Sequence, residues 1–136
     1  MTVAEVDRFL RAEFPQMFQD GEVFSIERIE SGRIAMGCRP GERHLRPGGT
    51  VSGPTLFTIA DVTAYVAVLS HVGPVALAVT TNLNINFLHR PRPGPLLCEG
   101  TILKLGKRLV VVDTVTRDER GTAVAQATGT YSVPPR

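Results

Sequence analysis

Four polar residues recur at intervals of three and four within one apolar stretch of the sequence: Thr55, Thr58, Asp61 and Tyr65. This spacing predicts that they share one stripe of a helix. Asp61 is the chemically important member, because a carboxylate in a buried helix must be hydrogen-bonded, paired, protonated or solvated. Two interpretations follow: a catalytic carboxylate, or a structural group bonded to neighbouring hydroxyls.

Directly before this stretch, Gly53 precedes Pro54, a pair typical of the start of a helix. The first N–H groups of a helix have no partner within it, and the positive end of the helix dipole lies there. This terminus is therefore either a site for a developing oxyanion or simply a common turn.

The other reactive side chains predict no site. Cys38 and Cys98 stand far apart and outside any CxxC pair, so we expect reduced core or strand residues. His44, His71 and His89 match no metal-binding spacing, so no metal site is expected.

The segment that carries Asp61 is predicted to be a central helix. It runs from Pro54 to His71 without internal glycine or proline, is apolar nearly all the way round, and ends at Gly73–Pro74. Other elements must enclose such a helix. The preceding loop, from Arg39 to Gly53, holds enough glycine and proline to exclude regular structure.

The remaining segments predict strands around that helix. A short amphipathic helix is expected first, over Thr2–Phe14. Val79–Phe87 alternates with period two, as in a strand with one covered face. The other predicted strands are Val23–Ile29, Arg33–Cys38, Leu96–Leu105, Leu109–Arg117 and Thr122–Val133, the last three as an antiparallel meander. The fold class is therefore α+β, an antiparallel sheet curled around one helix.

Composition predicts one ordinary globular domain over residues 1–136, with 43% hydrophobic and 21% charged residues. A net charge of +2 is too small to indicate nucleic-acid binding, but it is compatible with a phosphorylated small molecule. The first residues do not read as a signal peptide, so we expect a cytoplasmic protein that does not enter a membrane.

The segment Val51–Asp61 resembles the signature of phenylacetic-acid-degradation-type hotdog thioesterases, which reads His-Gly-Gly and then Leu-Ala-Asp on the central helix. Leu56, Ala60 and Asp61 match in register with Gly53. Thr81–Pro91 resembles the strand after that helix, and the order of elements agrees over nearly the whole chain. The resemblance implies the hotdog fold.

It also implies an acyl-coenzyme A thioesterase for a small, medium or aromatic acyl group, with no cofactor beyond the coenzyme A of the substrate. The N–H of Gly53 would polarise the thioester carbonyl, while Asp61 attacks it or activates a water. Such enzymes are homodimers or dimers of dimers, with active sites between subunits.

The sequence departs from this family pattern at three positions: Ser52 replaces His, Pro54 replaces the second Gly, and Arg46 replaces Asn. Pro54 has no N–H, so the oxyanion site would depend on Gly53, with the amides of Thr55 or Leu56 as further candidates. Ser52 would offer a hydroxyl in place of the imidazole, as a third catalytic group.

Further binding residues are expected around this site. The substrate-binding candidates are Pro54, Thr55, Thr58, Tyr65, Arg46 and Asn82. Arg90, Lys107 and Arg108 could meet the phosphates of coenzyme A, or be solvated residues at strand ends.

Two other functions stay open at this point. One is a non-catalytic acyl-thioester-binding hotdog protein. The other is a hotdog dehydratase or hydratase, although Ser52 leaves no His to pair with Asp61. The acyl chain, the carrier (coenzyme A or acyl carrier protein) and the choice of dimer or tetramer are also open.

Overall fold

The computed structural model describes residues 1–18 and 23–135. The elements follow the predicted order, with short additions. The helices are α1 (Val3–Glu13) and α2 (Gly53–Val72), with 3-10 turns at Pro15–Phe18 and Glu42–His44. The strands are β1 (Phe24–Glu30), β2 (Arg33–Cys38), β3 (Leu45–Arg46), β4 (Thr50–Val51), β5 (Val79–Phe87), β6 (Leu96–Leu105), β7 (Leu109–Arg117) and β8 (Ala123–Ser132).

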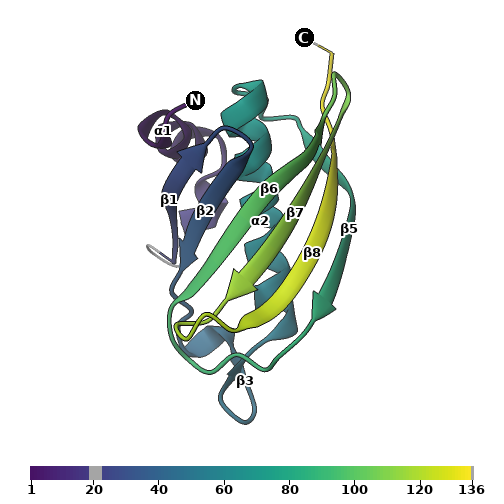
Figure 1. The fold of residues 1–136 in the computed structure, drawn as a ribbon. Coiled ribbons are helices and arrows are strands. Elements are labelled where there is room, and N and C mark those ends of the chain that lie inside the picture. Colours follow the sequence, from purple (N-terminus) through teal and green to yellow (C-terminus); the bar gives the residue numbers. More distant parts are fainter. Residues whose placement is uncertain (19–22, 136) are drawn as a thin grey trace.

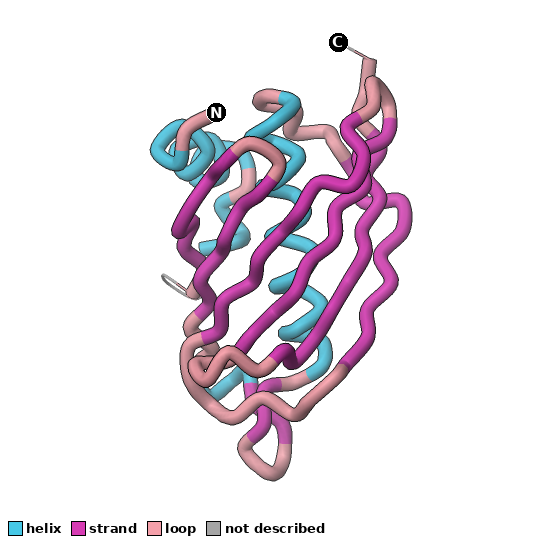
Figure 2. The backbone as a smooth tube through the Cα atoms, in the orientation of Figure 1, coloured by secondary structure: helices cyan, strands magenta, loops and turns pink. Residues whose placement is uncertain are grey.

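Six strands form one antiparallel sheet in the order β1-β2-β6-β7-β8-β5. Figures 1 and 2 show this sheet curved across α2, with α1 beside it at the β1 edge. The predicted hotdog architecture is therefore confirmed, including the β6–β7–β8 meander. Strand β5 lies at the opposite edge of the sheet from β1 and carries the chain back from the end of α2.

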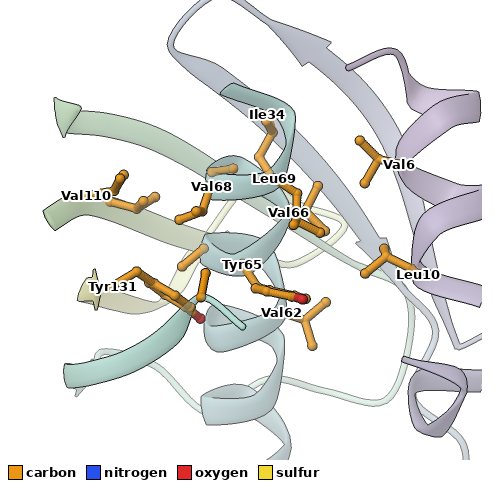
Figure 3. Packing of buried hydrophobic residues seen from close by; sticks show 14 of the residues in the cluster. Val6, Leu10, Ile34, Val62, Tyr65, Val66, Val68, Leu69, Val110 and Tyr131 are labelled. Atoms are coloured by element: carbon orange, nitrogen blue, oxygen red, sulfur yellow. The ribbon is translucent and has the colours of Figure 1, made fainter. Parts of the chain in front are cut away.

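The long helix α2 provides the centre of the core. Most of its side chains are buried from Leu56 onward, although its length and apolar composition would also suit a membrane-spanning helix. Figure 3 shows its side chains packed between the sheet, which contributes Ile34 and Val110, and α1, which contributes Val6 and Leu10. Burial of this kind, at about 25 cal/mol per Å² of apolar surface, is the main force that holds the helix in place.

The predicted loop between β2 and α2 is partly regular, which corrects the expectation of no regular structure there. Leu45–Arg46 pairs with Thr50–Val51 in a short hairpin. The glycines that suggested an irregular loop make this turn possible, because Gly48 and Gly49 adopt φ of 99° and 77°. Such angles strain any residue with a side chain. The hairpin leads the chain directly into α2.

Strand β5 differs from prediction in its two faces. The pairing with β8 shifts between Thr80 and Asn82, so a bulge at Thr81 reverses the alternation. Thr80 consequently turns toward α2, while Val79 joins the outer face. The predicted covered face therefore holds for Leu83 and Ile85, which are half-buried, but not for Val79, which is 55% exposed. The exposed strand is an unpaired edge of the sheet.

Candidate active site

Asp61 lies near the middle of α2 and is half-buried against strands β5 and β8. The hydroxyls of Thr80 and Tyr131 lie 2.8 Å and 2.5 Å from its Oδ1 atom. Its other carboxylate oxygen, Oδ2, has no hydrogen-bond donor among the described residues. Asp61 is therefore a carboxylate with one oxygen fixed and one oxygen open.

Both partners of Asp61 were missed in the sequence. Period two placed Thr80 on the face opposite to the apolar residues of its strand, and only the bulge turns it inward. Tyr131 is buried at 2% exposure and lies 70 residues away along the chain, so no local pattern connects it to Asp61. Its position in a β8 face otherwise made of small and apolar residues was the one available signal.

The start of α2 is capped by Ser52. Its hydroxyl accepts a hydrogen bond from the amide of Thr55 at 3.3 Å and lies 2.7 Å from the Thr55 hydroxyl. The amide of Leu56 donates to the carbonyl of Ser52. Neither amide is therefore available as an oxyanion donor, and the role observed for Ser52 is that of a helix cap.

The amide of Gly53 differs from the amides that follow it. It has no acceptor among the described residues and lies at the first position of the helix, where the dipole favours negative charge. A Cβ at this position would lie 3.5 Å from the ring of Phe87, so the end of β5 packs directly on Gly53. Of the predicted oxyanion donors, the structure supports this one.

Gly53 opens into a cleft of about 650 Å³. The cleft lies between the β3–β4 hairpin and the segment after β5, and its lining includes Arg46, Phe87, His89 and Arg90. The structure thus brings two predicted binding residues, Arg46 and Arg90, to the same cleft as the helix start. Two arginines beside a helix N-terminus favour an anionic ligand.

A second, mainly apolar cleft of about 410 Å³ lies on the other side of the helix start. Pro54, Thr55, Thr58 and Val62 form its helix wall. The opposite wall comes from Phe14, Gln16, Met17, Val23, Phe24 and His44. Thr58 lies one turn before Asp61 on the helix, but Asp61 itself does not line this cleft.

Four other predicted residues lie away from these clefts. Tyr65 is buried, and its hydroxyl donates to the carbonyl of Ala76 at 3.3 Å. Asn82 is exposed on the outer face of the sheet. Lys107 and Arg108 lie in the β6–β7 turn, at the opposite end of the molecule from the start of α2 in Figure 1. The structure therefore separates these two basic residues from Arg90.

The cysteines are core residues, as predicted. Both thiols are free and buried. Burial raises the pKa of the Cys38 thiol to about 12 and also raises that of Cys98. A thiol of this kind is a poor nucleophile at neutral pH. Within the described ranges, no three His, Cys, Asp or Glu side chains lie close enough to hold a metal ion.

Sequence comparison agrees with this geometry. Residues 48–125, which include both Gly53 and Asp61, match the family described as the Thioesterase superfamily. A protein of Saccharolobus solfataricus that carries the name of an esterase is 32% identical, over 98% of this chain and 86% of that protein.

Solved structures show the same fold. A protein of Silicibacter sp. TM1040 that carries the name of a thioesterase has a TM-score of 0.88 and 45% identity, over 99% of this chain and 93% of that one. A Streptococcus mutans protein bound to acetyl-CoA has a TM-score of 0.75 and 26% identity, over 85% and 91% of the two chains.

Proposed function

The chain belongs to the thioesterase superfamily and is a thioester hydrolase, and from this premise we propose that it hydrolyses a medium-chain or aromatic acyl-coenzyme A. The observation that carries the proposal is that helix α2 holds two polar groups without a partner among the described residues, a carboxylate oxygen and a main-chain amide. Asp61 offers an unpartnered carboxylate oxygen, and the Gly53 amide offers an unpartnered donor at the helix start.

The chemistry divides between these two groups. The amide of Gly53 stabilises the negative charge that develops on the thioester oxygen, aided by the helix dipole. Asp61 either attacks the carbonyl carbon or removes a proton from an attacking water. In the first route the carbon–sulfur bond breaks as an anhydride forms between the acyl group and Asp61, and a water then hydrolyses this anhydride. In the second route the water adds to the carbonyl carbon directly, and the carbon–sulfur bond breaks as the sulfur takes up the proton. Both routes consume one water and end with coenzyme A as a thiol and the acyl group as a free acid.

Gly53 and Asp61 of one chain cannot act on the same carbonyl. They are eight residues apart on a helix that rises about 1.5 Å per residue, so about 12 Å separates them. A complete site therefore needs a second copy of the chain.

The unpaired edge strand β5 supports such an assembly. Its first residues lie beside Asp61 through Thr80, and its last residue, Phe87, packs on Gly53. Two copies of β5 paired antiparallel about a twofold axis would place the Thr80 end of one beside the Phe87 end of the other. Each Asp61 would then face the Gly53 of the other copy. We therefore propose a homodimer at least.

The two clefts suggest how the substrate is divided. The cleft with Arg46 and Arg90 suits the phosphates of coenzyme A, because arginine side chains bind phosphate by charge-assisted hydrogen bonds. The Streptococcus mutans protein bound to acetyl-CoA shares the fold. The apolar cleft beside Thr58 and Val62 suits the acyl group, and its volume of about 410 Å³ exceeds the need of an acetyl group. This is the basis for proposing a medium-chain or aromatic acyl group.

The first test is thiol release from a panel of short, medium and aromatic acyl-coenzyme A esters. Asp61→Asn keeps the size of the side chain but removes its charge, so it should lower kcat by at least about 100-fold. Asp113→Asn is the matched control, because Asp113 lies on the outer face of the sheet, where it accepts a bond from Gln126. The control should retain wild-type turnover.

Two results would contradict the proposal. Equal turnover in wild type and Asp61→Asn would remove the carboxylate from the mechanism. Turnover of acetyl-coenzyme A alone, with no activity on longer or aromatic esters, would remove the apolar cleft as the acyl site.

A further inference from the structure

We propose that Tyr131 is a positioning residue, whose hydroxyl holds Oδ1 of Asp61 so that Oδ2 is the oxygen presented to the substrate. This inference rests on the proposed hydrolysis and assigns a role to a residue outside the sequence motif. Tyr131 does not itself reach the open side of the carboxylate.

The geometry around Oδ1 carries the inference. The Tyr131 hydroxyl lies 2.5 Å from this atom, and the Thr80 hydroxyl lies 2.8 Å from it. Two donors on one oxygen fix the rotation of the carboxylate about its last bond. Thr80 is exposed, but Tyr131 is 2% exposed, so the tyrosine is the rigid member of the pair.

Packing holds the tyrosine ring in one orientation. Its ring stacks on that of Tyr65, with centroids 6.3 Å apart and planes inclined at 22°. Tyr65 is itself fixed by its bond to Ala76. Figure 3 shows both rings beside α2.

The same environment keeps the hydroxyl a donor. Burial, and then the charge of Asp61, raise the pKa of Tyr131 well above its usual value. The phenol is therefore protonated at neutral pH. A protonated phenol beside a carboxylate can only donate to it.

A purely structural alternative exists, because the Tyr131 hydroxyl also lies 2.8 Å from the main-chain carbonyl of Asp61. A carbonyl within a helix already accepts an amide from the next turn, whereas a carboxylate oxygen carries charge and forms the stronger bond. The two acceptors differ in a testable way, since only the carboxylate bond depends on the charge of Asp61.

Kinetics test the positioning role. Tyr131→Phe should lower kcat for thiol release by about 10-fold or more and leave KM near wild type, as expected for a lost bond to a charged group. Thr128→Val removes an outer-face hydroxyl from the same strand and should change neither kcat nor KM. A wild-type kcat in folded Tyr131→Phe would overturn the proposal.

A second measurement does not depend on turnover. The chain has two tyrosines, so labelling tyrosine with ¹³C at Cζ gives two NMR signals, which Tyr131→Phe assigns. Asp61→Asn should shift the Tyr131 signal and leave that of Tyr65 almost in place. An unmoved Tyr131 signal overturns the positioning role whatever the activity. A moved signal in a protein that cleaves no ester supports the bond to the carboxylate and rejects the proposed hydrolysis instead.

Discussion

The two halves of α2 have similar apolar sequences but different surroundings. In the half that follows Asp61, the side chains from Val62 to Ser70 are buried without interruption. In the half that precedes it, Pro54, Phe57 and Thr58 are exposed, and Phe57 reaches 40% exposure. Apolar composition therefore has two uses in one helix. The later half lies wholly within the core, whereas the earlier half buries one face, which includes Leu56 and Ile59, and turns its other residues toward clefts.

The enclosed half is what fixes the position of the site. The sheet approaches it closely at Gly100, where a Cβ would lie only 3.2 Å from the side chain of Thr63. Side chains on facing elements interdigitate at nearly crystalline density, so the helix cannot slide or rotate. Asp61 lies at the boundary between the two halves. The packing of the later half fixes its position, and the weaker enclosure of the earlier half leaves it accessible to a substrate.

The largest expected effect is on stability, from a change in the enclosed half. Leu69→Ala empties a site that is 0% exposed and should lower the free energy of unfolding by about 2–5 kcal/mol. Turnover per folded molecule should stay close to wild type. Chemical denaturation measures the free energy of unfolding, and thiol release at low temperature measures the turnover.

The matched control makes the same truncation outside the core. Leu77 lies in the loop after α2 and is 77% exposed, so Leu77→Ala should change stability by less than about 0.5 kcal/mol. Similar losses in the two variants would show that the later half of the helix is not the core of the protein.

A change in the half of α2 that precedes Asp61 should have the opposite result, which is a large loss of activity with little loss of stability. Gly53→Pro removes the N–H but suits the first turn of a helix, so the protein should fold while kcat falls by about 100-fold. Gly53→Ala is the control, because it keeps the N–H and its Cβ meets Phe87 at an ordinary 3.5 Å. Equal activities of the two variants would remove this amide from the oxyanion site.

The same variant tests whether sites lie between copies. Asp61→Ala and Gly53→Pro should each impair both sites of their own homodimer, but a mixed dimer would contain one site with both groups intact. Refolding the two together in equal amounts should restore about a quarter of wild-type activity for a twofold dimer. No recovery would mean that each site lies within one chain.

Much of the fold could be predicted from the sequence. Four strands, β2, β5, β6 and β7, begin and end at the predicted residues, and α2 differs by one residue at each end. These elements have strong periodicity and are bounded by glycine or proline turns, which are local signals. The stripe of Asp61 and the glycine at the helix start could be predicted for the same reason.

What failed depends on contacts between distant segments. The bulge that turns Thr80 inward is a property of its pairing with β8, and Tyr131 meets Asp61 only once the sheet has curved around the helix. Ser52 illustrates a different limit. Its type and position suit both a helix cap and a catalytic hydroxyl, and the bond from Thr55 shows the first of these roles.

The smallest expected effect compares basic residues at the two ends of the sheet. Arg90 lines the cleft beside Gly53, whereas Lys107 lies in the turn at the far end. Arg90→Gln should raise KM for acyl-coenzyme A by about fivefold, which corresponds to roughly 1 kcal/mol for a partly solvated contact, and Lys107→Gln should not. The matching acyl-pantetheine ester lacks the nucleotide phosphates, so its KM should respond to neither change. The Arg90 effect should shrink at high salt, because solvent screens exposed charges. If Lys107→Gln produced the larger rise, the phosphates of coenzyme A would contact the β6–β7 turn in place of Arg90, and in the proposed dimer that turn could belong to the other copy, whose Thr80 end lies beside this cleft.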